Sequence, residues 1–231
     1  MAYMPEKPWR ILGAAAVLSV PLLALSLDVA KDDPSVSAAE IKPKASHSLL
    51  LDVAITDSGF VAVGERGHIL VSEDGSDWLQ SEVPTRSTLT SVSAQGASIW
   101  AAGHDGVILH STDSGKTWER QRVQPWSPDS QEITNGSAVL DTLFVDQNTG
   151  YAVGAYSLLL KTQDAGATWQ VLSVSGSAAP VAEQDMVASD TGVFTESDLA
   201  LAAESDPHLN AIVRTESGAL IVMGERGAGF K

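Results

Sequence analysis

Cysteine is absent from this 231-residue sequence, and basic residues are few. Without cysteine the chain has no disulfide bonds, no thiolate nucleophile and no cysteine-ligated metal site. The 14 lysines and arginines are outnumbered by 29 aspartates and glutamates, which gives a formal net charge of −15. Nucleic acids and anionic membrane surfaces would repel such a chain, so neither is expected as a partner. A hydrophobic content of 44% is still that of a domain with a packed core.

A short segment that ends in tryptophan occurs three times in the sequence. Residues 111–118 read STDSGKTW, residues 162–169 read TQDAGATW, and residues 72–78 read SEDGSDW, which is one residue shorter. Three copies indicate a repeat architecture. The shared positions are a hydroxyl residue (Ser72, Ser111, Thr162), an aspartate (Asp74, Asp113, Asp164), a glycine (Gly75, Gly115, Gly166) and the tryptophan (Trp78, Trp118, Trp169).

Each copy is expected to form a rigid turn between two strands. The aspartate can accept hydrogen bonds from backbone N–H groups further along the turn, and the glycine supplies positive φ where the chain reverses. The tryptophan opens the next strand and offers a large apolar face to a neighbouring sheet, so we expect all three tryptophans to be buried. Metal binding by the aspartates is the alternative, but a metal site needs several converging oxygens and each turn brings one reliable aspartate. We therefore expect no metal and no cofactor.

We call each of these tryptophan-ending segments a box. A second pattern precedes each box and fixes its register. Gly64, Gly103, Gly154 and Gly224 each follow a short apolar strand, and each precedes a three-residue turn. A further strand then runs into the box, with ten residues from this glycine to the box aspartate in all three complete copies. One strand before the glycine and one after the tryptophan complete the unit. The repeat is thus predicted to be four short antiparallel strands.

These residues carry a family resemblance. The pattern S-x-D-x-G-x-T-W resembles the Asp-box of the bacterial neuraminidase repeat. The longer pattern, with G-x-x-G before the strand and box, resembles the photosystem II stability and assembly factor family of β-propellers and its relatives in non-photosynthetic bacteria. The resemblance covers about residues 46–231. It implies an all-β propeller of four-stranded antiparallel blades, of which about three and a half are present, in a family that typically closes its ring with seven.

The first residues indicate export. Lys7 and Arg10 precede an apolar run over residues 11–27, and Ala24 and Ser26 are small residues of the kind that a signal peptidase reads. We interpret residues 1–26 as a secretory signal, with an uncleaved N-terminal anchor as the alternative. Either interpretation places the domain outside the cytoplasm, in the periplasm. Residues 27–45 are polar and contain proline, and are expected to be a linker.

The repeat divides the remaining chain into blades of unequal spacing. We expect blades at 46–84, 85–124 and 137–172, and an incomplete one at 208–231. The loop at 125–136 contains Trp126, which either folds back on the blade edge or is an exposed anchor for a partner. An insertion spans 173–207 and includes a predicted surface helix at 195–204, with Thr195 and Asp198 as a capping box. Because the sequence stops before a fourth box, we expect a longer protein, or else assembly with other chains.

An enzyme is not expected. A sialidase needs three clustered arginines, a tyrosine nucleophile beside a carboxylate, and an acid/base residue. The arginines of the blades do not match that pattern, Tyr151 lies in an apolar strand, and Tyr156 has no recognisable acid beside it in the sequence. The five histidines show no metal-ligand spacing. A sialidase-like hydrolase or another carbohydrate-binding propeller is the alternative function.

The expected function is a scaffold that binds a protein partner. In a radial propeller the turns between second and third strands emerge on one face, which either binds a partner or consists of solvent-exposed turns that are free to vary. Arg66 and Tyr156 favour binding, because both residue types are frequent interface anchors. The resemblance implies assembly or support of a membrane-associated complex: photosystem II in phototrophs, where members use a basic surface, and envelope transport systems elsewhere. This acidic chain departs from that basic surface, which favours a non-photosynthetic relative. The candidate binding residues are Glu65, Arg66, His104, Asp105, Tyr156, Glu225 and Arg226, together with Trp126.

Overall fold

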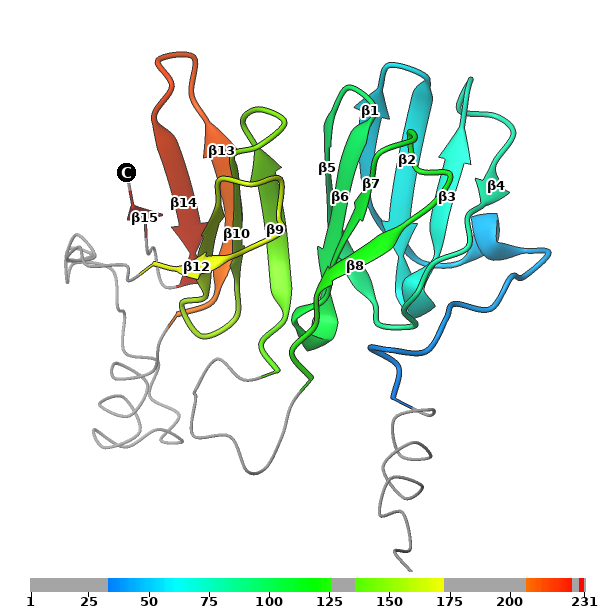
Figure 1. The fold of residues 1–231 in the computed structure, drawn as a ribbon, viewed down its shortest axis with the longest axis horizontal. Helices are drawn as coiled ribbons and strands as arrows, with labels where there is room; N and C mark the ends of the chain where they lie inside the picture. The colour runs from blue at the N-terminus through cyan, green and yellow to red at the C-terminus, as the bar shows by residue number, and fades with distance from the viewer. Residues whose placement is uncertain (1–32, 126–135, 173–206, 226–228, 231) are drawn as a thin grey trace, which may run out of the picture.

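The computed structural model describes residues 33–125, 136–172, 207–225 and 229–230, which form four antiparallel sheets (Figure 1). Three sheets have four strands each in sequential order, and the fourth has three described strands. We call each sheet a blade. Blade 1 contains β1 (Leu50–Thr56), β2 (Gly59–Gly64), β3 (Ile69–Ser72) and β4 (Leu79–Gln80). Blade 2 contains β5 (Leu89–Gln95), β6 (Ser98–Gly103), β7 (Ile108–Ser111) and β8 (Glu119–Arg122).

The other two blades follow the same plan. Blade 3 contains β9 (Val139–Phe144), β10 (Gly150–Gly154), β11 (Leu159–Thr162) and β12 (Gln170–Val171). Blade 4 contains β13 (Leu209–Arg214), β14 (Leu220–Gly224) and β15 (Gly229–Phe230). Three short 3-10 helices complete the described elements: η1 (Ala45–His47), η2 (Glu65–Gly67) and η3 (His104–Gly106). The prediction of an all-β fold built from four-stranded antiparallel units is confirmed.

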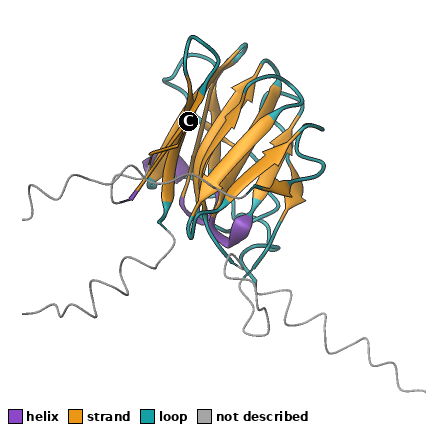
Figure 2. Ribbon diagram, turned by 90° about the vertical axis from the view of Figure 1, so that its left-hand side faces the viewer, coloured by secondary structure: helices purple, strands orange, loops and turns teal. Residues whose placement is uncertain are grey.

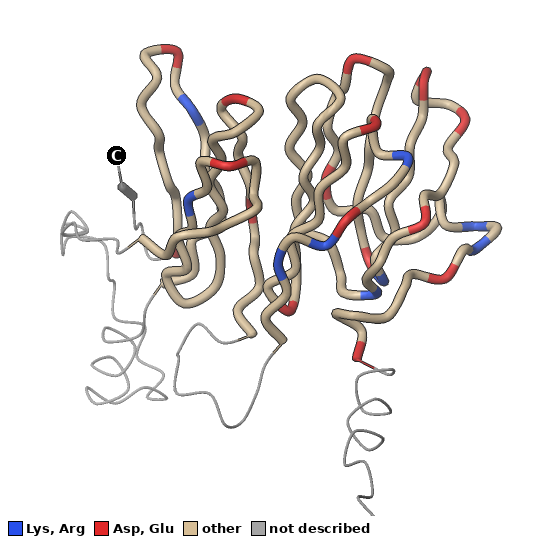
Figure 3. The backbone as a smooth tube through the Cα atoms, in the orientation of Figure 1, with Lys and Arg blue, Asp and Glu red and all other residues tan. Residues whose placement is uncertain are grey.

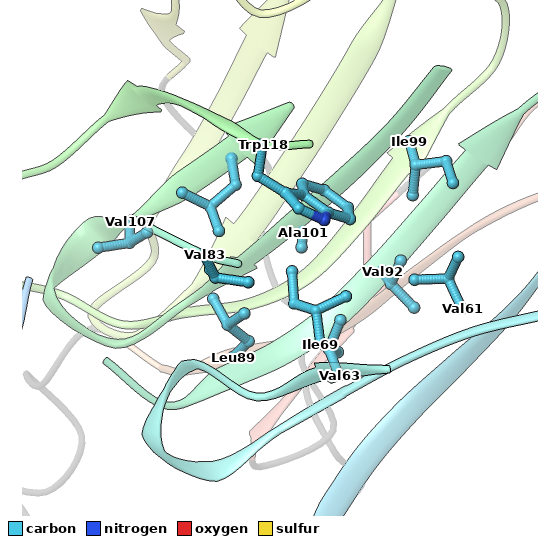
Figure 4. Close-up of a cluster of buried hydrophobic side chains, with 11 residues drawn as sticks. Val61, Val63, Ile69, Val83, Leu89, Val92, Ile99, Ala101, Val107 and Trp118 are labelled. Carbon is cyan, nitrogen blue, oxygen red and sulfur yellow. The ribbon is translucent and has the colours of Figure 1, made fainter. Parts of the chain in front are cut away.

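Consecutive blades pack face to face through apolar side chains. The cluster between blades 1 and 2 joins β2 and β3 to the inner strands of blade 2, and includes Trp118 from the second box (Figure 4). A second cluster lies between blades 2 and 3, around Ile108 and Leu160. A third joins blades 3 and 4 through Val153 and Ile212. Each sheet thus buries its alternate side chains against the next, as the period of a strand requires.

The glycine that ends each second strand is needed for a close approach of two backbones. A Cβ atom on Gly64 would lie 2.1 Å from the carbonyl oxygen of Leu49, and one on Gly103 would lie 2.0 Å from that of Thr88. The φ angles of these two glycines are −172° and −179°, so any residue could adopt the backbone conformation itself. The same carbonyl of Thr88 accepts the N–H of His104 at 2.9 Å. Because glycine has no Cβ atom, the backbone before the inner strand can come within hydrogen-bond distance of the turn.

The burial of the box tryptophans differs from the prediction. Trp118 is buried, with 8% of its surface exposed, and its indole N–H donates to the Gly115 carbonyl at 2.9 Å. Trp78 and Trp169 are only half-buried, so the expectation is wrong for them. Trp118 packs onto the preceding blade, whereas Trp78 belongs to blade 1, which has no preceding blade among the described residues. Trp169 also packs onto the preceding blade, but its buried indole nitrogen has no hydrogen-bond partner among the described residues.

A hydrogen bond from one inner strand to the next recurs at all three seams between blades. The carboxylate of Asp52 accepts the N–H of Val92 at 2.8 Å. The hydroxyl of Ser91 accepts the N–H of Thr142 at 2.9 Å. The carboxylate of Asp141 accepts the N–H of Ile212 at 2.8 Å. We call this set the seam hydrogen bonds; they join the blades by polar contacts in addition to apolar packing.

The segment before blade 1 is packed instead of being a free linker. Ser35 and Ala45 are buried, and the Ala39 N–H donates to the Val83 carbonyl at 2.9 Å. The Pro34 carbonyl accepts the N–H of Arg86 at 2.7 Å. The linker expected at 27–45 is therefore part of the folded domain from residue 33 onward.

Several sequence predictions concern segments outside the described residues. These are the signal or anchor at 1–26, the loop containing Trp126, the helix at 195–204 and the side chain of Arg226. In the part of the chain that the structure describes, no helix is long and apolar enough to span a membrane.

Candidate protein-binding surface

The described residues of the turns between second and third strands lie at one edge of the blades, the lower edge in Figure 1. We call this the turn edge and define it by η2, η3, residues 155–157 and Glu225. Figure 2 shows the same separation from the side, with helical turns toward the lower end of the sheets and hairpin loops at the upper end. Each helical turn also contacts the inner strand of the following blade, η2 with β5 and η3 with β9. The turns are consequently held by two blades.

The same position of three turns has a left-handed backbone although it is not glycine. The φ angles are 56° for Arg66, 56° for Asp105 and 55° for Tyr156. A left-handed conformation costs roughly 1–2 kcal/mol for a residue with a Cβ atom, and glycine would avoid this cost. Ser114 (φ 61°) and Ala165 (φ 58°) in the boxes also have left-handed backbones, but their side chains are small. The turn edge instead keeps arginine, aspartate and tyrosine at such positions, and strain that is retained with side chains of these types motivates a functional hypothesis for the turn edge.

The candidate residues differ in how far the scaffold already uses them. Arg66, His104 and Glu225 are exposed, and Tyr156 is 49% exposed. Asp105, in contrast, accepts a hydrogen bond from the Ser87 hydroxyl at 2.6 Å. Within the described residues no carboxylate lies within ion-pair distance of Arg66. The exposed side chains of the turn edge are thus available for contacts with another molecule.

The structure assembles a group at the turn edge that sequence reasoning missed. The rings of Tyr156 and His208 pack edge to face, with centroids 5.2 Å apart and planes at 76°. The His208 Nδ1 lies 3.7 Å from one carboxylate oxygen of Glu225, and the backbone N–H of His208 donates to the other carboxylate oxygen at 3.3 Å. An acid therefore does lie near Tyr156, but it contacts the imidazole. The repeat register could have indicated this, because the residue before each inner strand contacts the turn of its own blade.

The opposite edge carries the boxes and is strongly acidic. Loops at the upper edge of Figure 3 show mainly Asp and Glu, and few Lys or Arg. We call this the box edge. Its described acidic residues are Asp57, Glu73, Asp74, Asp77, Asp113, Asp146, Asp164 and Glu216, and its basic residues are Lys116 and Arg214.

The box aspartates use their oxygens inside their own turns. Asp113 accepts the Thr117 N–H at 2.9 Å, the Thr117 hydroxyl at 2.7 Å and the Ser111 hydroxyl at 2.8 Å. Asp164 makes the corresponding bonds in blade 3. The hydrogen bond from the Thr168 hydroxyl is the main cause that lowers the pKa of Asp164. These carboxylates stabilise turns, and among the described residues no three acidic or histidine side chains are placed to hold a metal ion.

Comparisons with known proteins agree with this architecture. The family model described as "Photosynthesis system II assembly factor YCF48" matches residues 36–132. The "Photosystem II assembly lipoprotein Ycf48" of Synechococcus sp. (strain CC9902) is 31% identical over 153 residues, which cover 62% of this chain and 42% of that protein. The "Photosystem II stability/assembly factor HCF136, chloroplastic" of Oryza sativa subsp. japonica is 29% identical over 159 residues, or 60% of this chain and 38% of that protein. The chain thus spans less than half the length of these relatives.

Two solved structures share the fold. The structure titled "YCF48 bound to D1 peptide" has a TM-score of 0.53 at 18% identity, covering 85% of this chain and 57% of that one. The structure titled "YCF48 from Cyanidioschyzon merolae" has a TM-score of 0.52 at 21% identity, covering 78% and 51%. At this identity the similarity shows the fold alone, and it confirms the propeller. Together, the matched repeat, the sequence relatives and the shared fold show that the chain is similar to the YCF48/HCF136 photosystem II assembly factor family of BNR-repeat propellers.

Proposed function

We propose that this chain is part of an exported, non-catalytic propeller that binds a protein partner through its turn edge and helps a membrane-associated complex to assemble. The observation that carries the proposal is the left-handed backbone at Arg66, Asp105 and Tyr156. A position that would be more stable as glycine keeps an arginine, an aspartate or a tyrosine in the three blades, on a rigid frame. Solvent-exposed turns without a function would be expected to relax toward glycine or asparagine over these three sites.

Two further observations support a protein partner and export. One solved relative is titled as bound to a D1 peptide, so a propeller of this fold can hold a peptide. The relatives are named lipoprotein and chloroplastic, and this chain has its own basic and apolar N-terminal run. The described carboxylates of the boxes are occupied in turns, and the half-buried carboxylate of Asp141 is occupied at a seam, which leaves few described groups for acid–base catalysis.

Affinity capture of the full-length protein tests the proposal. The tagged protein is expressed in the organism of origin, lightly cross-linked and purified from detergent-solubilised membranes, and the retained proteins are identified by mass spectrometry. The variant Arg66→Ala/Tyr156→Ala should lose subunits of a membrane-associated complex that the wild type retains. Alanine keeps the same backbone cost as the native residues, so thermal stability should change little.

A matched variant on the other edge is the control. Lys116→Ala/Glu73→Ala removes two exposed side chains from the box edge of blades 1 and 2 and should retain the complex. Retention by the turn-edge variant, with loss by the box-edge variant, would move the binding surface to the opposite edge. Hydrolysis of fluorogenic sialosides or other glycosides by the purified protein would instead support the alternative function, a carbohydrate-active propeller.

A further inference from the structure

The group formed by Tyr156, His208 and Glu225 lies where blades 3 and 4 meet on the turn edge. Tyr156 comes from the turn of blade 3, and the other two residues flank the strands of blade 4. Two backbone hydrogen bonds hold the segments that carry these residues. The Ser157 N–H donates to the Pro207 carbonyl at 2.9 Å, and the Glu225 N–H donates to the His208 carbonyl at 2.9 Å. The three side chains therefore project from a common, well-anchored base.

The group combines an exposed aromatic ring with an exposed carboxylate. Tyr156 is 49% exposed despite its contact with His208, and the Glu225 side chain is 48% exposed. Within the described residues no lysine or arginine nitrogen lies within 4.0 Å of the Glu225 carboxylate, which contacts the His208 ring. The exposed tyrosine ring and the exposed carboxylate both contact the same histidine. Such a pair of groups is suited to a lysine or arginine side chain, which gains a cation–π contact and an ion pair.

Blade 1 shows which part of this arrangement is structural. Glu65 occupies the same position as Glu225, and it accepts the Leu49 N–H at 3.3 Å just as Glu225 accepts the His208 N–H at 3.3 Å. In blade 1 the residue before the inner strand is a leucine, and no aromatic ring is described beside it. The glutamate thus supports the turn in both blades, whereas the tyrosine and histidine are additions at the seam between blades 3 and 4.

We infer that this group binds a lysine or arginine side chain in an exposed segment of the protein partner. The formal net charge of −15 draws a cationic segment toward the chain, and the group gives it a defined place on the turn edge. The inference rests on the proposed function, because it names the chemistry of the partner at the same surface. It also explains why Tyr156 holds a large aromatic side chain at φ 55°.

A peptide titration tests the inference directly. The probe is acetyl-Gly-Arg-Gly-amide, with its citrulline counterpart as a neutral molecule of nearly the same shape, and binding to the isotope-labelled full chain is followed by NMR at one fixed pH. We expect the arginine peptide to shift resonances of blades 3 and 4 with a Kd in the range of about 1 mM, and the citrulline peptide to bind at least fivefold more weakly. Equal binding of the two peptides would overturn the inference.

Variants locate the site and separate its parts. Tyr156→Ala and Glu225→Gln should each weaken the arginine peptide by about 5- to 30-fold, and Tyr156→Phe, which keeps the ring, should change it by less than about twofold. Glu73→Gln, which removes an exposed carboxylate from the box edge, is the matched control and should bind like the wild type. Loss in Glu73→Gln equal to that in Glu225→Gln would show a general charge effect and would contradict the inference. If affinity capture retains the complex but the arginine peptide does not bind, the inference alone is overturned. If the arginine peptide binds but affinity capture retains no complex, the proposed function alone is overturned.

Discussion

The carboxylate of Asp52 accepts the backbone N–H of Val92 at 2.8 Å, across the seam between the first two blades. The equivalent hydrogen bond from the Ile212 N–H to Asp141 joins blades 3 and 4. Between blades 2 and 3, the Ser91 hydroxyl accepts the corresponding hydrogen bond from the Thr142 N–H. Apolar side chains pack across the same seams, but apolar packing does not specify one register along the strands. The seam hydrogen bonds fix that register, because each needs one particular N–H group opposite one side chain.

The first prediction concerns Asp141. The Asp141→Ala variant should lower the free energy of unfolding by about 1–3 kcal/mol, because the buried N–H of Ile212 loses its acceptor. Asp141→Asn keeps an oxygen in the same place and should lose clearly less. Urea denaturation of the three proteins measures both values. An alanine variant as stable as the wild type would show that the seam hydrogen bonds contribute nothing to stability.

The second prediction is a pH dependence with a defined sign. Burial raises the pKa of Asp141, although three hydrogen bonds act against the shift. The folded state thus binds this proton more tightly than the unfolded state, whose carboxyl has a pKa of about 3.9. The protonated Asp141 contributes stability that is fully present below the pKa of the unfolded state. This contribution is lost as the pH rises through the raised pKa of the folded state.

The asparagine variant isolates this titration. The unfolding free energy of the wild type, minus that of Asp141→Asn, should decrease as the pH rises above about 4 and then become constant. Urea denaturation over a series of pH values measures the difference, and the other titrating groups cancel because both proteins contain them. A difference that increases with pH would mean that the carboxylate is stabilised at the seam, against this account.

The third prediction compares two box tryptophans. Trp118→Ala should destabilise the protein by about 3–5 kcal/mol, because it removes a large side chain from the cluster between blades 1 and 2. Trp78→Ala should cost markedly less, since Trp78 is only half-buried in the described structure. Thermal and urea unfolding of both variants measure the order. Equal costs would show that Trp78 is covered by residues beyond those the structure describes.

The sequence allowed prediction of the repeat unit because the unit is determined locally. A polar box turn needs its aspartate, glycine and tryptophan at fixed spacing, and the second glycine marks where two backbones touch. The same residues recur at a constant spacing in the sequence, so the strands between them could also be predicted. The half-burial of Trp78 could not be predicted in this way, since it depends on which blade lies next to the turn, and the residues of the box do not contain that information.

The candidate site was predictable only in part. That the turns of successive blades meet at one edge followed from the radial plan, and this gave Arg66 and Tyr156 as candidates. The contacts of His208 did not follow, because its neighbours come from two blades and from opposite ends of a long insertion. The seam role of Asp141 was equally hidden: the shared position is aspartate in blades 1 and 3 (Asp52 and Asp141), serine in blade 2 (Ser91) and alanine in blade 4 (Ala211).

The fourth prediction separates stability from binding at a single residue. Arg66→Gly should leave the midpoint of thermal unfolding unchanged or raise it, because relief of the left-handed cost of roughly 1–2 kcal/mol exceeds the entropic cost of glycine, about 0.5–1 kcal/mol. The same variant should capture less of the partner complex. A lowered midpoint would mean that the Arg66 side chain is part of the scaffold, which would remove it from the proposed binding surface.

The central claim is that the turn edge meets the partner, and site-specific photo-crosslinking in living cells tests it most directly. A photoreactive amino acid replaces Tyr156 on the turn edge in one variant and Lys116 on the box edge in another. The account predicts crosslinks from position 156 to subunits of a membrane-associated complex, and none to those subunits from position 116. Crosslinks to the complex from position 116 alone would contradict it.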